Sequence, residues 1–207
     1  MLPTLLATVV LAAAPSSPAP LSLARQVQAF YERTHDLEAE FVQNYTYAAF
    51  GRTQVSRGTL RVKKPGKLRW DYVEPSQKTI VVNGSRLVQF EPEANQAYVD
   101  EHFDATAMSA AVTFLLGKGS LEKEFDLATD ADGRLVLTPK VPDARVERIL
   151  LTVGGSGEVT ATSVRDGSGN VNEISFRNIR RNPGLRDDVF VLELPKDVHR
   201  VKPPAGG

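Results

Sequence analysis

GTLRVKKPGKLRWDY, residues 58–72, is the stretch of this sequence that decides the fold. Apolar residues alternate with polar ones on both sides of Pro65-Gly66: Leu60 and Val62 come before the pair, and Leu68, Trp70 and Tyr72 come after it. A period of two gives each strand one apolar face and one polar face. Proline supplies the fixed φ, and glycine the permissive φ, that a tight turn needs. The stretch therefore predicts an amphipathic β-hairpin.

The same alternation continues along most of the chain. Before the hairpin, residues 37–50 alternate and return through residues 55–63, with Leu37, Ala39, Phe41, Tyr45 and Tyr47 on one face. After it, residues 79–82 and 86–90 flank Asn83-Gly84, a strong signal for a two-residue hairpin. Further alternating runs follow at residues 96–99, 124–128, 135–138, 146–153, 160–165, 171–179 and 189–194. The pattern predicts an antiparallel meander of about ten or eleven strands.

Two segments have helical spacing instead. In residues 21–33 an apolar stripe recurs at i, i+4, i+7 and i+8, and Ser22 is the predicted N-cap. Residues 105–116 place small and apolar side chains on one face, including Phe114 and Leu115, and Gly117 is expected to end that helix. Many antiparallel strands with two short helices predict an α+β domain built on one curved sheet.

The two ends of the chain differ from the part between them. The apolar run in residues 2–14 is too short to span a bilayer as a helix, and it matches the core of a secretory signal peptide. No Lys or Arg precedes that run, so a disordered N-terminal tail is the alternative. We predict a cleaved signal and linker at residues 1–20, one domain at 21–198, and a flexible tail at 199–207.

Composition narrows the range of functions. The 25 basic and 25 acidic residues balance, so no global field attracts nucleic acid, and we expect no nucleic-acid partner. A chain of 207 residues is long enough for one domain with a substantial core. The sequence contains no cysteine, which excludes disulfides and thiolate chemistry. A bacterial lipoprotein is acylated on an N-terminal cysteine, so this chain is not itself one.

A search for catalytic and metal-binding motifs gives no candidate. His35, His102 and His199 lie far apart in the sequence and form no ligand spacing. Asp130-Ala-Asp132-Gly133 lacks the rest of a calcium loop, and no Lys-Ser/Thr follows Gly154-Gly-Ser-Gly157 as a phosphate loop requires. The GxSxG nucleophile motif is absent. We expect no enzyme activity, no metal and no cofactor, although catalysis by a serine or by paired carboxylates stays open.

An ordered set of short motifs surrounds the hairpin. They are Phe41-Val-Gln43, Lys63-Lys64-Pro65, Leu68-Arg69-Trp70, Glu74-Pro75, Ile80-Val-Val-Asn-Gly84, Leu87-Val-Gln-Phe90-Glu-Pro92, Asn95-Gln-Ala97, Leu137-Thr-Pro-Lys140 and Phe190-Val-Leu-Glu-Leu194-Pro195. In this order and at these spacings, residues 21–198 resemble the LolA family of periplasmic outer-membrane lipoprotein carriers.

The resemblance implies a fold and a function. The fold would be an unclosed antiparallel half-barrel, with short helices as a lid over a hydrophobic cavity. Acyl chains would lie against Phe41, Tyr45, Leu60, Val62, Leu68, Trp70, Tyr72, Leu87, Phe90, Phe114 and Leu115. The protein would be a periplasmic monomer that receives acylated lipoproteins from an ABC-type inner-membrane releasing complex. It would deliver them to an acceptor lipoprotein at the outer membrane.

Two other functions are compatible with such a half-barrel. One is a lipid-sensing regulatory domain that binds a membrane anti-sigma factor, and the other is a general periplasmic lipid-binding protein. Both would use an apolar cavity of the same kind.

Lys64 departs from the pattern of the family. The position before the turn proline is commonly Arg there, and its side chain is thought to hold the lid through backbone carbonyls. An ammonium is a single compact charge where a guanidinium is a planar fork of five donors, so Lys64 would act less specifically as the lid latch. The alternatives are that Lys64 is a solvated turn residue, or that Lys63 or Arg69 takes its place.

Overall fold

The computed structural model describes residues 19–104 and 119–201, and its main element is one 12-stranded sheet. The strands are β1 (Asp36–Tyr47), β2 (Arg52–Lys63), β3 (Lys67–Glu74), β4 (Lys78–Asn83), β5 (Arg86–Glu91), β6 (Gln96–Asp100), β7 (Phe125–Thr129), β8 (Leu135–Pro139), β9 (Arg148–Val153), β10 (Val159–Arg165), β11 (Val171–Arg181) and β12 (His199–Val201). The helical elements are α1 (Pro20–Glu32), α3 (Leu121–Glu124), and the 3₁₀ turns η1 (Pro92–Ala94) and η3 (Asp187–Phe190).

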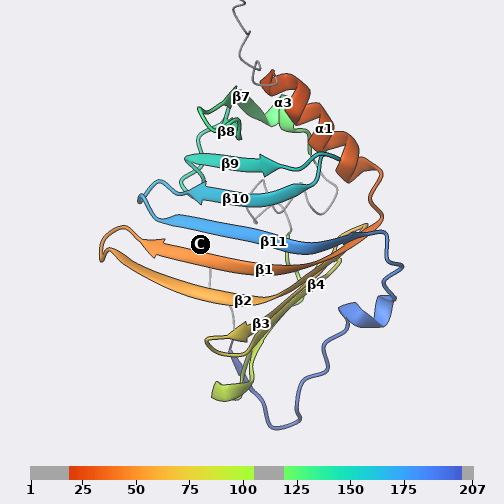
Figure 1. Cartoon of the computed structure of the whole chain (residues 1–207). Helices are drawn as coiled ribbons and strands as arrows, with labels where there is room; N and C mark the ends of the chain where they lie inside the picture. Colours follow the sequence, from red (N-terminus) through yellow and green to blue (C-terminus); the bar gives the residue numbers. More distant parts are fainter. Residues whose placement is uncertain (1–18, 105–118, 202–207) are drawn as a thin grey trace, which may run out of the picture.

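The strand order is β12-β6-β5-β4-β3-β2-β1-β11-β10-β9-β8-β7. Two antiparallel meanders, β1–β6 and β7–β11, therefore meet where β1 pairs with β11, and the sheet ends at β12 and β7 without closing on itself. Figure 1 shows this sheet curving, with α1 beside the β7–β10 half. The α+β half-barrel is confirmed.

The central hairpin has the predicted register. Val62 lies opposite Leu68, and Leu60 lies opposite Trp70, so their side chains share one face, which we call the inner face. Gly58 is required because a Cβ there would stand 1.8 Å from the backbone oxygen of Asp71. The register shifts at this residue, and only a bare backbone lets β3 approach so closely.

Several local predictions are wrong. The helix begins at Pro20 after Ala19, so Ser22 lies inside α1 and is not its N-cap; a proline at this first position loses no helical hydrogen bond. Asn83 pairs with Arg86, which makes Gly84-Ser85 the turn rather than Asn83-Gly84.

The C-terminal part differs most from the predictions. Residues 189–194 form no strand, since η3 ends at Phe190 and the chain runs on without pairing. The next strand is β12, which pairs in parallel with β6 inside the segment predicted as a flexible tail from residue 199. This additional pairing takes the count to 12 rather than ten or eleven. The predicted signal at residues 1–18 and the predicted helix at 105–116 lie outside the described residues.

Residues 182–198 form a strap along the outer face of the β2–β6 meander, visible as the blue segment that leaves β11 in Figure 1. Phe190 is its apolar anchor at 1% exposure, and η3 packs against β3 and β4. The apparent strand pattern of residues 189–194 reflects this burial against a sheet face. Asp187 pairs with Lys63 at 2.6 Å and with Lys67 at 2.9 Å, which fixes the start of the strap.

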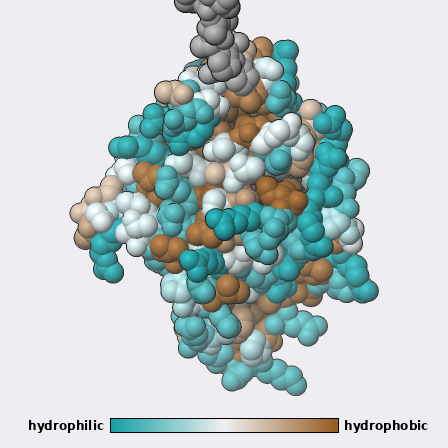
Figure 2. All heavy atoms as spheres, viewed as in Figure 1, coloured by the Kyte–Doolittle hydropathy of each residue, from teal (hydrophilic) through white to brown (hydrophobic). Residues whose placement is uncertain are grey.

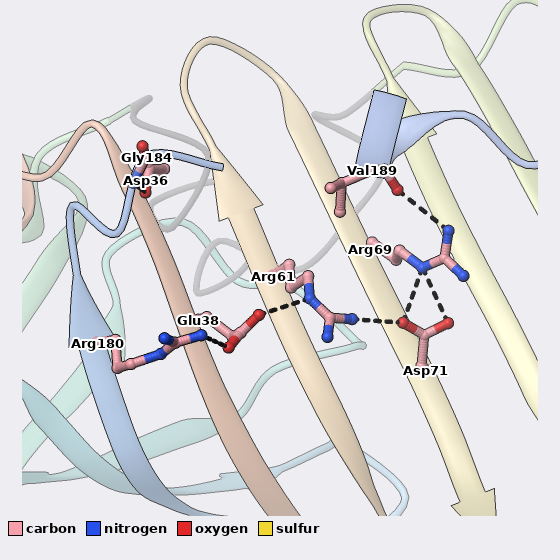
Figure 3. Close-up of polar contacts among 8 residues, drawn as sticks. All are labelled: Asp36, Glu38, Arg61, Arg69, Asp71, Arg180, Gly184 and Val189. Atoms are coloured by element: carbon pink, nitrogen blue, oxygen red, sulfur yellow. Dashed lines mark hydrogen bonds and ion pairs between the residues drawn. The ribbon is translucent and has the colours of Figure 1, made fainter. Parts of the chain in front are cut away.

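A row of alternating charges crosses the outer face from β11 to the strap (Figure 3). Arg180 bonds Glu38, whose other oxygen accepts from Arg61 at 2.7 Å. Arg61 also donates to Asp71 at 2.9 Å, and Asp71 accepts from Arg69. Arg69 then donates to the carbonyl oxygen of Val189 in the strap at 3.1 Å. In the space-filling view of Figure 2, hydrophilic residues cover most of the visible surface, with brown hydrophobic patches between them.

Candidate functional site

A small apolar cavity lies between α1 and the inner face of the sheet. It has a volume of about 60 Å³, and its walls include Tyr31 from α1, Leu60 and Val62 from β2, Leu137 from β8 and Ile149 from β9. One water needs roughly 10–15 Å³ by the same measure, so this space holds a few waters. A long acyl chain needs far more room than this space offers.

The sequence of α1 explains why the lid side of this cavity is apolar. Val27 and Phe30 of α1 are 0% and 3% exposed. They pack in one cluster with Leu135 and Ile149 of the sheet, which are both 0% exposed. Burial raises the pKa of Tyr31 to about 12, although a backbone hydrogen bond with Val159 opposes the shift. We call the β7–β11 part of the sheet, together with α1 packed on it, the covered half.

An aromatic cluster continues the inner face on β1–β5. Phe41 meets Trp70 edge to face at 5.4 Å between ring centroids and Tyr72 at 5.0 Å, while Trp70 and Tyr72 stack at 6.2 Å. Leu60 and Val62 belong to this cluster and also line the cavity, so the two regions are contiguous. We call the β2–β5 region the aromatic half.

Lys64 connects the sheet to the end of α1. Its Nζ donates a hydrogen bond to the carbonyl oxygen of Tyr31, and its backbone N–H donates to the oxygen of His35 at 2.8 Å. The last carbonyls of a helix lack intrahelical partners and carry the negative end of its dipole, so a cation is favourable there. Burial lowers the pKa of Lys64, and the charge of Glu32 acts in the opposite direction.

Asn182 holds the same junction from the other side. Its Oδ1 accepts from the N–H of His35 at 2.7 Å, its own N–H donates to Asp36 at 2.8 Å, and its Nδ2 donates to Arg33 at 3.3 Å. The side chain of Asp36 in turn accepts from the N–H of Gly184 at 3.1 Å. The link between α1 and β1 is therefore fixed to the strap as well as to Lys64.

The structure brings most of the predicted cavity residues together. The residues that share the aromatic cluster are Phe41, Leu60, Val62, Leu68, Trp70, Tyr72 and Leu87. Tyr45 lies farther along β1, where its ring packs against that of the exposed Tyr47, with 4.7 Å between the ring centroids. Phe114 and Leu115 fall outside the described residues.

Phe90 is wrong as a cavity residue. Leu87 lies opposite Val82 of the inner cluster, whereas Phe90 lies opposite Ala97 and Thr79. Residues three apart on a strand point to opposite faces, so Phe90 is on the outer face.

Sequence reasoning missed part of the second half of the cavity and the contacts that Asn182 makes at the end of α1. Leu137, Ile149 and Val159 line the cavity but were read only as strand residues. The alternation of these residues is visible in the sequence. The strand order that places them under α1 is not. Asn182 carried no local signal, because its partner His35 is 147 residues away.

The described residues include no group of three or more His, Cys, Asp or Glu side chains arranged to hold a metal ion. Within the same part of the chain, no helix has the length and apolarity needed to cross a membrane.

Comparisons with known proteins agree with this architecture. Residues 32–193 match the family described as outer membrane lipoprotein carrier protein LolA. The outer-membrane lipoprotein carrier protein of Dechloromonas aromatica is 34% identical to this chain, and the match covers 87% of this chain and 84% of the relative. The protein of the same name from Methylobacillus flagellatus is 30% identical, and the match covers 82% of this chain and 83% of that relative. A conserved protein of Thermus thermophilus has the same fold, with a TM-score of 0.53 at 11% identity over 88% of this chain and 98% of that structure. The chain belongs to the LolA family.

Proposed function

We propose that this protein carries acylated lipoproteins across the periplasm and shields their acyl chains between α1 and the inner face of the sheet. The observation that carries the proposal is the apolar cavity beneath α1, a helix whose C-terminal end is held by contacts from Lys64 and Asn182. Membership of a family of lipoprotein carriers supplies the cargo class.

The energetics favour a carrier that does no chemistry. Each methylene moved out of water is worth about 0.8 kcal/mol, so several acyl chains would exceed any reversible affinity if water were the reference. The relevant reference is the membrane, from which transfer to an apolar cavity is nearly neutral. Loading then needs an energy-driven donor, an ATP-driven inner-membrane complex, and unloading needs a slightly better acceptor at the outer membrane.

The small size of the cavity bears on how cargo enters. A space of about 60 Å³ cannot take a long chain, so α1 must move away from the sheet during loading. Such a movement would change the contacts that Lys64 and Asn182 make at the end of α1.

Native mass spectrometry of the protein purified from its own periplasm tests the proposal. A one-to-one complex with an acylated protein supports it, and the same spectrum tests whether the carrier is a monomer. A free lipid would indicate a general lipid-binding protein, and a membrane regulator as partner would indicate a sensor; either result overturns the carrier.

A pair of variants on β1 provides the matched control. Ala39 lines the cavity at 2% exposure, and Ala39→Leu puts three more carbon atoms into it. Val42 lies on the opposite face of the same strand, and Val42→Leu adds volume away from the cavity. We expect the first variant to lose bound cargo and the second to keep it.

Export requires the N-terminal segment to act as a signal peptide. We propose that residues 1–20 are its signal and linker and that the mature chain begins between Ala13 and Leu21. Mass analysis of exported protein checks this, and a mature chain that retains Met1 contradicts it.

A further inference from the structure

The indole N–H of Trp70 has no hydrogen-bond partner among the residues that the structure describes. Among the shielded side-chain nitrogen and oxygen atoms of the described residues, Nε1 of Trp70 alone lacks one. A buried donor without an acceptor is unfavourable, and tryptophan N–H groups usually find a partner when buried. Such an exception calls for an explanation.

The surroundings of this atom are apolar and aromatic. Trp70 lies on the inner face between Leu60 of β2 and Ile80 of β4, with Phe41 against its edge and Tyr72 stacked on it. The interlocked rings hold the indole in one orientation. A fixed donor in an apolar environment is how binding sites orient the few polar atoms of a ligand.

We propose that the indole N–H of Trp70 recognises a carbonyl oxygen of the cargo's acyl linkage, which rests on the proposed function. Acyl chains are joined to glycerol or to an amine through ester or amide carbonyls. That oxygen is the acceptor that must accompany a chain into an apolar site. Leu60 and Val62 connect the cavity to the aromatic cluster, so a chain under α1 places its carbonyl end near Trp70.

The ligand class follows from this geometry. The site prefers chains attached through a carbonyl over chains of equal length attached through an ether, because an ether linkage lacks the carbonyl oxygen and its own oxygen lies at a different position. A carbonyl leaves no donor unpaired in the complex, whereas an ether-linked chain buries the indole N–H unsatisfied.

A matched pair of probes tests the inference on the full mature chain. One is a synthetic peptide whose N-terminal cysteine carries a glycerol with two ester-linked hexadecanoyl chains. The other is the same peptide with two ether-linked hexadecyl chains. We expect the wild type to bind the ester probe about tenfold more tightly, which corresponds to about 1.4 kcal/mol.

Two variants assign the preference to one atom. Trp70→Phe keeps an aromatic ring and removes the donor, so we expect it to bind both probes equally. Tyr72→Phe is the control, because it removes the other hydroxyl or N–H donor of the stacked pair and should leave the tenfold preference in place.

A measurement on the wild type covers the case in which Trp70→Phe does not fold. The chain contains one tryptophan, so its indole N–H gives a single resonance in a ¹H–¹⁵N spectrum. We expect that proton to move downfield with the ester probe and not with the ether probe. If both probes bind with equal affinity, or Trp70→Phe keeps the preference, the inference is wrong while the carrier function stands. If neither probe binds, the proposed function fails and the inference fails with it.

Discussion

The covered half and the aromatic half bury their inner faces in different ways. Under α1, Leu135 and Ile149 are completely shielded, and the helix packs along the strands as in an ordinary core. On the aromatic half, Trp70, Tyr72 and Leu87 are only partly buried, and the strap packs on the outer face instead. The aromatic half has a buried base of its own, with Leu68 at 1% and Val82 at 0% exposure, but its rings keep surface available for a ligand.

Truncating one leucine in each half gives the largest expected difference. Leu135→Ala removes a fully buried side chain and should lower the free energy of unfolding by about 2–5 kcal/mol. Leu87→Ala acts on a half-buried residue, so we expect about 1 kcal/mol, together with weaker cargo binding. Urea unfolding of both variants measures the contrast. Equal losses would mean that Leu87 contributes to the structural core as much as Leu135 does.

The contrast also shows which features were predictable from the sequence. The hairpin at residues 58–72 was, because its alternation and its turn are local. The pairing of β1 with β11 was not, because any two amphipathic strands can pair, and this pairing puts the second meander under α1. Period-two parity already separated Leu87 from Phe90, so naming both as cavity residues contradicted the pattern itself.

The site was predictable only in part for the same reason. The position of Lys64 came from the resemblance, and its contact with Tyr31 joins residues 33 apart through the geometry of the turn. The strap was read as a strand followed by a tail, since a segment anchored by Phe190 on a sheet face has the same apolar spacing as a short strand.

The next test concerns the outer face: whether the row of alternating charges stabilises the sheet beneath both halves. Arg61 is the central cation, with a side chain 27% exposed between Glu38 and Asp71, which are 18% and 20% exposed. Arg61→Met leaves both carboxylates with one partner fewer and should lower the free energy of unfolding by about 1–3 kcal/mol. Thermal or urea unfolding measures the loss.

Arg180→Met is the matched control at the end of the row. Its side chain is 63% exposed, so we expect a loss below about 1 kcal/mol. A loss as large as that of Arg61→Met would show that the position of an arginine in the row does not affect its contribution to the free energy of unfolding.

Lys64 tests whether α1 is released as a lid. Lys64→Arg can donate more than one bond to the carbonyls at the end of α1, and a closed state favoured by about 1.4 kcal/mol more lowers apparent cargo affinity about tenfold. Lys64→Leu removes the donor, so cargo should bind more tightly and transfer to an acceptor more slowly. Titration with an acylated peptide, followed by the emission of Trp70, measures both.

Lys63→Leu separates the lid contact from the neighbouring charge. Lys63 bonds the strap through Asp187 and the carbonyl oxygen of Leu185, so its loss should leave cargo affinity unchanged. If both Lys64 variants also leave affinity unchanged, Lys64 is a structural turn residue.

The smallest expected effect concerns the strap and acid. Lys63 and Lys67 lower the pKa of Asp187 to about 2, below the ordinary value of roughly 3.9. A carboxyl group whose pKa is lowered by folding stabilises the folded state above its unfolded pKa, and that contribution disappears as the pH falls from about 4 to about 2. Because Asp187 is exposed, the effect should be smaller than those above and should shrink at 1 M salt.

Asp187→Asn should remove this part of the acid dependence and speed amide exchange in β12, which the strap leads into. Asp143→Asn is the control, since that carboxyl also has a pKa of about 2 but pairs with Arg145, two residues away, and should not change exchange in β12. If the two variants respond to acid alike and β12 exchanges at the wild-type rate in both, the ion pairs do not hold the strap, and Phe190 and the hydrogen bond from Arg69 to Val189 anchor it to the aromatic half.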